Sequence, residues 1–135
     1  MMEIKFSEFM EHGVPQSIDA NLYIIWDNKQ ALYVGISIGN VWTRWFGGYG
    51  SHMTYFTNGL LTAESWIGNI ILNNKPKSMD WDIELLSLDD YKNKEEHYIK
   101  LYRPLFNRML RDNYTTKENK LINYYEKQNL YAGVA

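Results

Sequence analysis

The chain has 135 residues, a formal net charge of −2 and no cysteine. This length suits one domain with a single sizeable core. The lack of cysteine excludes disulfides, thiol nucleophiles and cysteine-based zinc sites, and it fits a reducing compartment. No apolar run reaches the length of a membrane span and the start of the chain is acidic, so we expect a cytoplasmic protein with no membrane partner.

Charge is unevenly distributed along the chain. Residues 91–111 hold six basic and two acidic side chains, whereas residues 1–90 hold five basic and eleven acidic ones. The acidic overall balance argues against a nucleic-acid-binding protein. A local basic excess is more often a solvated helix face, but it also suits contact with phosphate. Both interpretations of residues 91–111 are open at this point.

A β-hairpin is predicted near the start of the chain. Residues 1–20 indicate a lead-in segment with a short helix at Phe6–Glu11. Two apolar runs follow, Leu22–Trp26 and Ala31–Ile36, and both are rich in residues that favour strands. The polar Asp27–Gln30 between them has the length of a hairpin loop.

Tyr23 and Tyr33 place one phenol on each strand of this hairpin. A three-residue loop would put them opposite each other on one face, whereas a loop of two or four residues would put them on opposite faces. The sequence leaves this register open. Gly35 indicates close approach by a backbone or a ligand within the second strand. In a chain with eleven tyrosines, ordinary packing also explains two on a hairpin.

A short helix is expected directly after the hairpin. Asn40 is suited to cap its first turn, and the helix would run over residues 41–46 and carry Arg44. The glycine-rich segment 47–59 follows and contains His52. A loop histidine is most often simply solvated, but it is also available for binding or proton transfer.

Another helix and another strand are predicted between residues 62 and 86. Thr62 is a candidate cap for the helix. The apolar positions of that helix recur at helical spacing: Trp66, Ile67, Ile70 and Ile71. Apolar and acidic residues alternate in Trp81–Leu86, which is typical of a strand with one buried and one wet face.

The next helix carries an acidic residue on its apolar side. Asp89-Asp90 is suited to begin this helix, which would end near Arg103. Its apolar stripe consists of Tyr91, Tyr98, Ile99 and Tyr102. Glu95 falls on the stripe, whereas Glu96 lies about 100° away around the helix. A carboxylate there is costly unless it is paired, hydrogen-bonded or bound to a metal, so an ion pair and a metal site both remain open.

The hairpin resembles the signature of the GIY-YIG nuclease family. Tyr33-Val34-Gly35 is similar to the second half of that signature, and Asn21-Leu22-Tyr23 is similar to the first half, with Asn in place of the usual Gly. Arg44 follows the second tyrosine by eleven residues, where the family has an arginine after about ten. Ile36 and Ser37 occupy the positions where some members carry a lysine.

The segment from Glu95 to Asn107 resembles the C-terminal motif of the same family. In that motif a helix carries the metal-binding glutamate and is followed by an Ile-Lys pair, a proline and a final asparagine. Matching the pair to Ile99-Lys100 and the proline to Pro104 places the glutamate on Glu95 and the asparagine on Asn107. The apolar stripe selected the same glutamate without reference to the family.

The resemblance covers residues 21–107 and implies an α+β fold, with a small central antiparallel three-stranded sheet flanked by helices. We therefore expect one domain over residues 1–135, with the nuclease-like core at 21–107 between the lead-in and a C-terminal extension at 108–135. The extension indicates a final helix that packs on the core through Leu121, Ile122, Tyr124 and Tyr125.

The resemblance implies hydrolysis of phosphodiester bonds in DNA with one divalent metal, Mg²⁺ or Mn²⁺. Glu95 would bind the metal and Arg44 would hold the phosphate through its planar guanidinium. A tyrosine would act as general base, and the resemblance favours Tyr23 over Tyr33. A free phenol ionises near ~10, so its pKa must fall or its proton must move on as it acts.

The resemblance further suggests substrate contacts from Gly35, His52, Lys100 and Asn107. His52 has two possible roles there, either replacing the absent lysine or shuttling a proton. The departures from the family pattern and the acidic balance leave an alternative, a catalytically inactive nucleic-acid-binding or interaction module on the same fold. A third possibility is an unrelated α+β domain in which the short motifs occur by chance.

Overall fold

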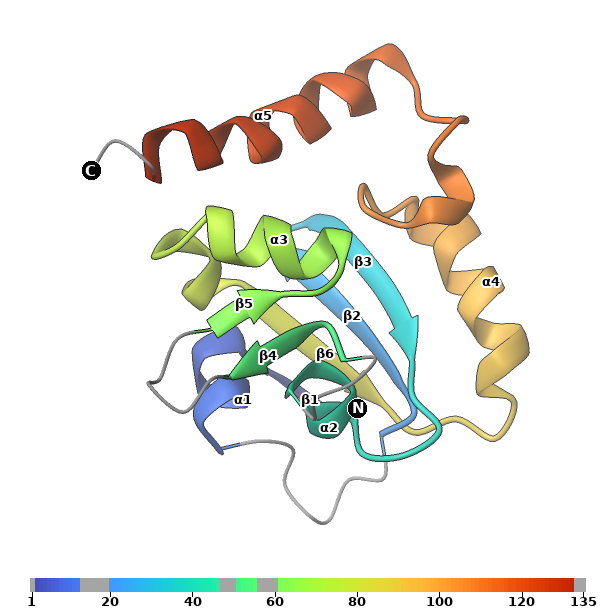
Figure 1. Cartoon of the computed structure of the whole chain (residues 1–135). Coiled ribbons are helices and arrows are strands. Elements are labelled where there is room, and N and C mark those ends of the chain that lie inside the picture. Colours follow the sequence, from blue (N-terminus) through green and yellow to red (C-terminus); the bar gives the residue numbers. More distant parts are fainter. Residues whose placement is uncertain (1, 13–19, 47–50, 56–60, 133–135) are drawn as a thin grey trace.

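The structure, a computed structural model, describes residues 2–12, 20–46, 51–55 and 61–132. It has an α+β fold with a four-stranded antiparallel sheet and five helices (Figure 1). The strand order is β1-β6-β2-β3, and the strands are β1 (Met2–Lys5), β2 (Leu22–Asp27), β3 (Gln30–Ile36) and β6 (Asp82–Leu86).

The prediction of a three-stranded sheet was wrong by one strand. β1 adds to the outer side of β6, with Met2 opposite Leu85 and Lys5 opposite Asp82. The sequence of this strand, MEIK, is too short for its alternation to indicate a strand. The other three strands form where they were predicted.

Both faces of the sheet are covered. The helices are α1 (Phe6–His12), α2 (Val41–Phe46), α3 (Trp66–Asn73), α4 (Tyr91–Tyr102) and α5 (Thr116–Ala132). One face packs against α1, α2 and α3 through the larger core, and the opposite face packs against α4 through a smaller one. α5 lies across α3, as Figure 1 shows. Among the described residues, no helix combines the length and apolar character needed to span a membrane.

The hairpin between β2 and β3 has a two-residue turn and a β-bulge. Asn28 takes a left-handed conformation in the turn, at φ 56°. Asp27 pairs with Gln30 and Trp26 with Ala31, but Ile25 pairs with Tyr33, so Leu32 is the extra residue. The bulge reverses the expected effect of a two-residue loop, because it shifts the register by one residue.

As a result, the two tyrosines of the hairpin lie on the same face of the sheet. Tyr23 is directly opposite Gly35, two residues from Tyr33. The ring centroids of the two tyrosines are 6.0 Å apart. A two-residue loop without the bulge would have separated them.

The helix starts follow capping chemistry, with one correction to the predictions. Asn40 caps α2 as predicted, because its Oδ1 accepts from the N–H of Trp42 at 2.7 Å. Ser65, and not Thr62, caps α3: its Oγ accepts from the N–H of Gly68 at 3.1 Å. Thr62 instead lies in β5 (Leu61–Ala63), which pairs with β4 (Met53–Tyr55) in a separate two-stranded sheet.

This small sheet lies partly inside the segment predicted to be a flexible glycine-rich loop. β4 begins directly after His52. Residues 47–50 and 56–60 of that segment lie outside the described residues. Three-residue strands carry too little pattern to be recognised in a sequence.

The outer edge of β3 is covered by the chain that follows α4. The N–H groups of Leu105 and Phe106 donate to the carbonyls of Ala31 and Leu32, at 3.3 and 2.9 Å. Further along, Asn107 bonds to Val34 twice, accepting from its N–H at 2.9 Å and donating to its carbonyl at 2.8 Å. An open sheet edge is a site for unwanted pairing, and this segment covers it.

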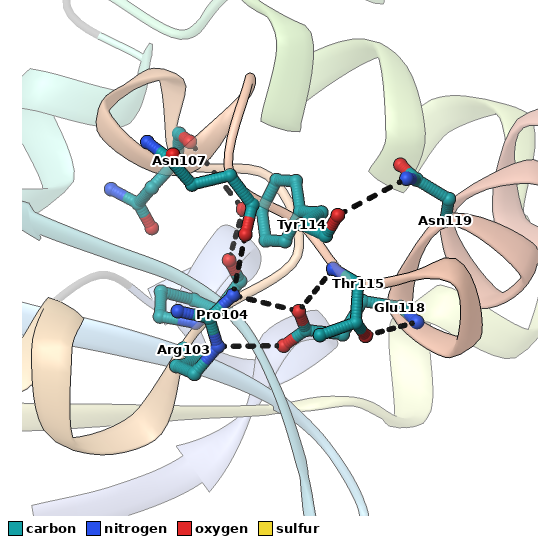
Figure 2. A network of polar contacts seen from close by, with 8 residues as sticks. Arg103, Pro104, Asn107, Tyr114, Thr115, Glu118 and Asn119 are labelled. Atoms are coloured by element: carbon teal, nitrogen blue, oxygen red, sulfur yellow. Dashed lines mark hydrogen bonds and ion pairs between the residues drawn. The ribbon is translucent and has the colours of Figure 1, made fainter.

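A polar network holds the turn between α4 and α5 (Figure 2). Arg103, at the end of α4, donates to both carboxylate oxygens of Glu118, at 3.0 and 2.8 Å. Glu118 also forms a capping box with Thr115, since each side chain accepts from the other residue's N–H. The hydroxyl of Tyr114 donates to the carbonyl of Pro104. α5 is therefore anchored to the segment that covers β3.

Candidate active site

A cavity of about 340 Å³ opens beside β3, where the segment after α4 approaches α2 and the β4–β5 hairpin. Five of the residues that the sequence proposed for a site line it: Tyr33, Arg44, His52, Glu95 and Asn107. They come from β3, α2, the residue before β4, α4 and the segment after α4. A second cavity, of about 490 Å³, lies elsewhere, between Lys5, Asp80 and Tyr125, and contains none of these residues.

Tyr23 lies behind Tyr33 and does not line the cavity. Its side chain is fully buried, whereas that of Tyr33 is half-buried. Gly35 makes room for it, because a Cβ at this position would lie 2.5 Å from Cζ and from Oη of Tyr23. The close approach expected at Gly35 is therefore made by a phenol of the same protein.

His52 connects Tyr23 to the cap of α3. Nε2 of His52 lies 2.6 Å from Oη of Tyr23, and Nδ1 lies 2.7 Å from Oγ of Ser65. The backbone of His52 is also fixed, since its N–H donates to Arg44 at 3.1 Å and its carbonyl accepts from Glu64 at 2.7 Å. The imidazole is buried and held at both nitrogens, so it is not the solvated loop residue that a histidine in this segment would ordinarily be.

Burial dominates the ionisation of this cluster. It raises the pKa of Tyr23 well above the ordinary value of a phenol, and it also raises the pKa of Tyr33. Burial, followed by the charge of Arg44, lowers the pKa of His52 to about 3. At neutral pH His52 is therefore neutral and both phenols are protonated.

Nearby charges also act on the two phenols. The charge of Arg44 lowers the pKa of both Tyr23 and Tyr33, whereas the charge of Glu95 raises both. Arg108 acts in addition to lower the pKa of Tyr33. Of the two phenols, Tyr33 is the less deeply buried, and it is the one that faces the cavity.

Glu95 is oriented as its position on the apolar stripe predicted. It is half-buried and lines the cavity, whereas the Glu96 side chain is 58% exposed and pairs with Lys100 at 2.9 Å. Within the described residues Glu95 has no hydrogen bond or ion pair, so the ion-pair explanation of its position finds no partner. Burial raises its pKa.

The residues around Glu95 fit a weakly chelated divalent cation. Among the described residues no three carboxylate, imidazole or thiol groups converge to hold a metal ion. A half-buried carboxylate without a protein partner, facing a cavity, suits a hard cation such as Mg²⁺ or Mn²⁺ that takes its remaining ligands from water and phosphate. Glu95 is the residue that would hold it.

Two residues proposed to bind substrate are placed differently from each other. Lys100 does not line the cavity, and its side chain is 70% exposed beside Glu96. Asn107 lines the cavity, but both ends of its amide are used by the backbone of Val34. Its contacts therefore position β3 and the adjacent Tyr33.

Asn21, which stands before Leu22-Tyr23 at the start of β2, has a similar structural role. Its Nδ2 donates to the carbonyl of Leu88 at 2.7 Å, and its Oδ1 accepts from the N–H of Leu88 at 3.0 Å. These bonds join the start of β2 to the chain that follows β6. Asn21 is thus accommodated away from the cavity.

Sequence reasoning missed the four other residues of the cavity lining whose side chains carry a nitrogen or oxygen atom. These are Glu64, Ser65, Trp66 and Arg108. Ser65 was recognisable as a cap, because it directly precedes the apolar stripe of α3. Glu64 and Arg108 belong to no motif, and only the folded chain brings them near Glu95.

Comparison with family models, with curated proteins and with solved structures finds no match for this chain.

Proposed function

We propose that the chain is a divalent-metal-dependent endonuclease of the GIY-YIG type that hydrolyses phosphodiester bonds in DNA. The observation that carries this proposal is the cavity beside β3. It gathers a phenol, a guanidinium and an unpartnered carboxylate from three separate elements: Tyr33, Arg44 and Glu95. These three groups can provide a general base, a cation that binds phosphate and a metal ligand, which together suit phosphodiester hydrolysis.

Tyr33 is the general base in this proposal. It faces the cavity, where a water molecule can reach it, whereas Tyr23 is fully buried. Behind Tyr33, the hydroxyl of Tyr23 lies 2.6 Å from Nε2 of His52, and Nδ1 of His52 lies 2.7 Å from Oγ of Ser65. The positive charges of Arg44 and Arg108 act to lower the pKa of Tyr33, and they therefore stabilise the phenolate that removes a proton from the attacking water.

Arg44 and Glu95 act on the phosphate. The planar guanidinium of Arg44 presents two N–H groups to phosphate oxygens as negative charge accumulates on them. Glu95 provides a carboxylate oxygen as a metal ligand. A divalent cation bound there would supply charge neutralisation at the scissile phosphate and at the leaving oxygen.

Cleavage of supercoiled plasmid and of single-stranded DNA, with Mg²⁺, Mn²⁺ or EDTA, tests this function. We expect metal-dependent cleavage by the wild-type protein and none by Glu95→Ala. Glu96→Ala is the matched control, because Glu96 is exposed on the same helix and should leave cleavage unchanged. Binding of DNA without any cleavage would favour the inactive nucleic-acid-binding module.

A further inference from the structure

A groove of about 400 Å³ adjoins the candidate active site. The two cavities share part of their walls, at Glu64, Ser65, Trp66 and Arg108. The groove extends from there to Arg111 and Asn69, and it therefore continues the site in one direction, past the start of α3. A polymer held at Arg44 and Glu95 would have to leave the site through openings of this kind.

Arg111 is held in position in this groove. Its Cζ lies 4.9 Å from the centre of the Trp66 ring, in a cation–π contact. Trp66 is itself fixed, because its Nε1 donates to Glu126 at 3.1 Å and its ring meets Phe106 edge to face. This contact uses none of the guanidinium N–H groups in a hydrogen bond to oxygen, so these groups stay available to an anion.

The arginines that follow α4 differ in their pairing. Arg103 is neutralised by Glu118 through two hydrogen bonds, as Figure 2 shows. Arg108 and Arg111 are exposed, and in the described part of the chain neither has a carboxylate partner. Glu64 is the acidic residue of the groove lining, so two guanidinium groups face one carboxylate there.

We propose that this groove binds the phosphodiester backbone of the nucleic-acid strand on one side of the scissile bond. Arg108 contacts the phosphate nearest the site, since it lines both cavities, and Arg111 contacts the next phosphate outward. The assignment rests on the proposed nuclease function, and it adds a substrate-binding surface outside the residues of the family motifs.

Salt-dependent binding of a fluorescein-labelled single-stranded DNA oligonucleotide, in EDTA so that no cleavage occurs, tests the groove. Each phosphate contact contributes about 0.7 to the slope of log K against log salt concentration for a single strand. Replacing both arginines, Arg108→Ala with Arg111→Ala, should therefore lower the slope by about 1.4. Between 50 and 200 mM salt, the wild-type affinity should then fall about sevenfold more than that of the variant.

The matched control removes two lysines from an exposed part of α5, Lys117→Ala with Lys120→Ala. This control should keep the wild-type slope. Equal slopes and affinities for the arginine variant and the wild type would overturn the groove assignment, while metal-dependent cleavage by the wild type would leave the nuclease proposal standing. A wild-type protein that neither binds nor cleaves DNA would remove both.

Discussion

The same Tyr→Phe change should have different effects at Tyr23 and at Tyr33, because one hydroxyl group is buried and the other faces the cavity. Tyr33→Phe should lower the cleavage rate about a hundredfold, a typical contribution of a general base, with little change in melting temperature. Tyr23→Phe removes the bond to His52 behind Tyr33 and no group of the cavity itself, so we expect a smaller loss of rate. It should also lower the free energy of unfolding by about 1 kcal/mol. Single-turnover cleavage and thermal melting measure the two effects.

The pH dependence of cleavage provides an independent measurement on Tyr33. Its pKa is raised by burial, so the phenolate is a minor form at neutral pH and its population grows as pH rises. The wild-type rate should therefore increase with pH through the neutral range. This increase should disappear in Tyr33→Phe; an unchanged profile in that variant would assign the proton transfer to another group.

At Arg44 the planar shape of the side chain should matter as much as its charge. Arg44→Lys keeps the positive charge but loses the bidentate fork, so it should be nearly as damaging as Arg44→Ala. A lost contact to the transition state costs about 3 kcal/mol, or about a hundredfold in rate. Cleavage at the wild-type rate by Arg44→Lys would mean that Arg44 contributes only its positive charge.

Gly35 and Gly39 form a matched pair for testing the packing around Tyr23. A methyl group at Gly35 would lie 2.5 Å from the Tyr23 ring and 2.7 Å from that of Tyr33, whereas one at Gly39 meets nothing within 4 Å. Gly35→Ala should therefore destabilise the protein by about 1–3 kcal/mol through overpacking, and Gly39→Ala should not. Urea unfolding of both variants measures the difference.

At the level of secondary structure, Asn107 joins β3 to the segment after α4. Asn107→Ala would leave both backbone groups of Val34 without their partner, at a cost of about 1–3 kcal/mol for each group that becomes unsatisfied. Asn93→Ala is the control, because the Asn93 amide bonds to Asp90 at the exposed start of α4. Denaturant unfolding should show a large loss for the first variant and a small one for the second.

The junction of α4 and α5 should make the protein sensitive to acid. Hydrogen bonds from Arg103 lower the pKa of Glu118 from 4.5 to about 2, so the folded protein binds this proton less readily than the unfolded chain does. The resulting stabilisation is fully present above pH 4.5 and is lost as the pH falls toward 2. Glu118→Gln should reduce the steepness of this loss, which thermal melting at several pH values would detect.

The elements that the sequence predicted are those with a repeated pattern. α3, α4 and β6 have apolar residues at the spacing of a helix or a strand; α4 and β6 form close to their predicted bounds, whereas α3 is capped three residues later than predicted. β1 and β4 were not predicted, because four and three residues carry no period. The hairpin register was equally hidden, since the bulge at Leu32 depends on pairing with another strand.

The periodic pattern also had limits within the helices that it predicted. Tyr102 was assigned to the apolar stripe of α4, and Tyr124 to the core-facing side of α5. Their exposed fractions are 39% and 51%. Tyr102 instead meets Trp26 edge to face at the rim of the sheet, with ring centroids 5.0 Å apart. Tyr102 is the last residue of α4 and Tyr124 lies in the middle of α5, so spacing alone does not show which positions of a stripe the core reaches.

At the scale of the whole molecule, the sequence predicted which side chains would lie close together, but not how deeply each of them would be buried. Tyr33, Arg44 and Glu95 line one cavity, as the family resemblance implied. Tyr23 lies one layer deeper, and Lys100 faces away. Depth depends on what packs above a side chain, here Tyr33 and His52 over Tyr23, and that information is spread over the whole chain.

The long sequence separation of these contacts has a consequence for the protein during translation. The cavity needs groups from Tyr33 to Asn107, and the pairing of Met2 with Leu85 joins the start of the chain to its later part. A ribosome releases the N-terminal strands well before the α4 carboxylate emerges. An incomplete nascent chain therefore lacks Glu95 and Asn107. If the protein cleaves DNA as proposed, this order of synthesis keeps the unfinished chain inactive until α4 and the segment after it have been made.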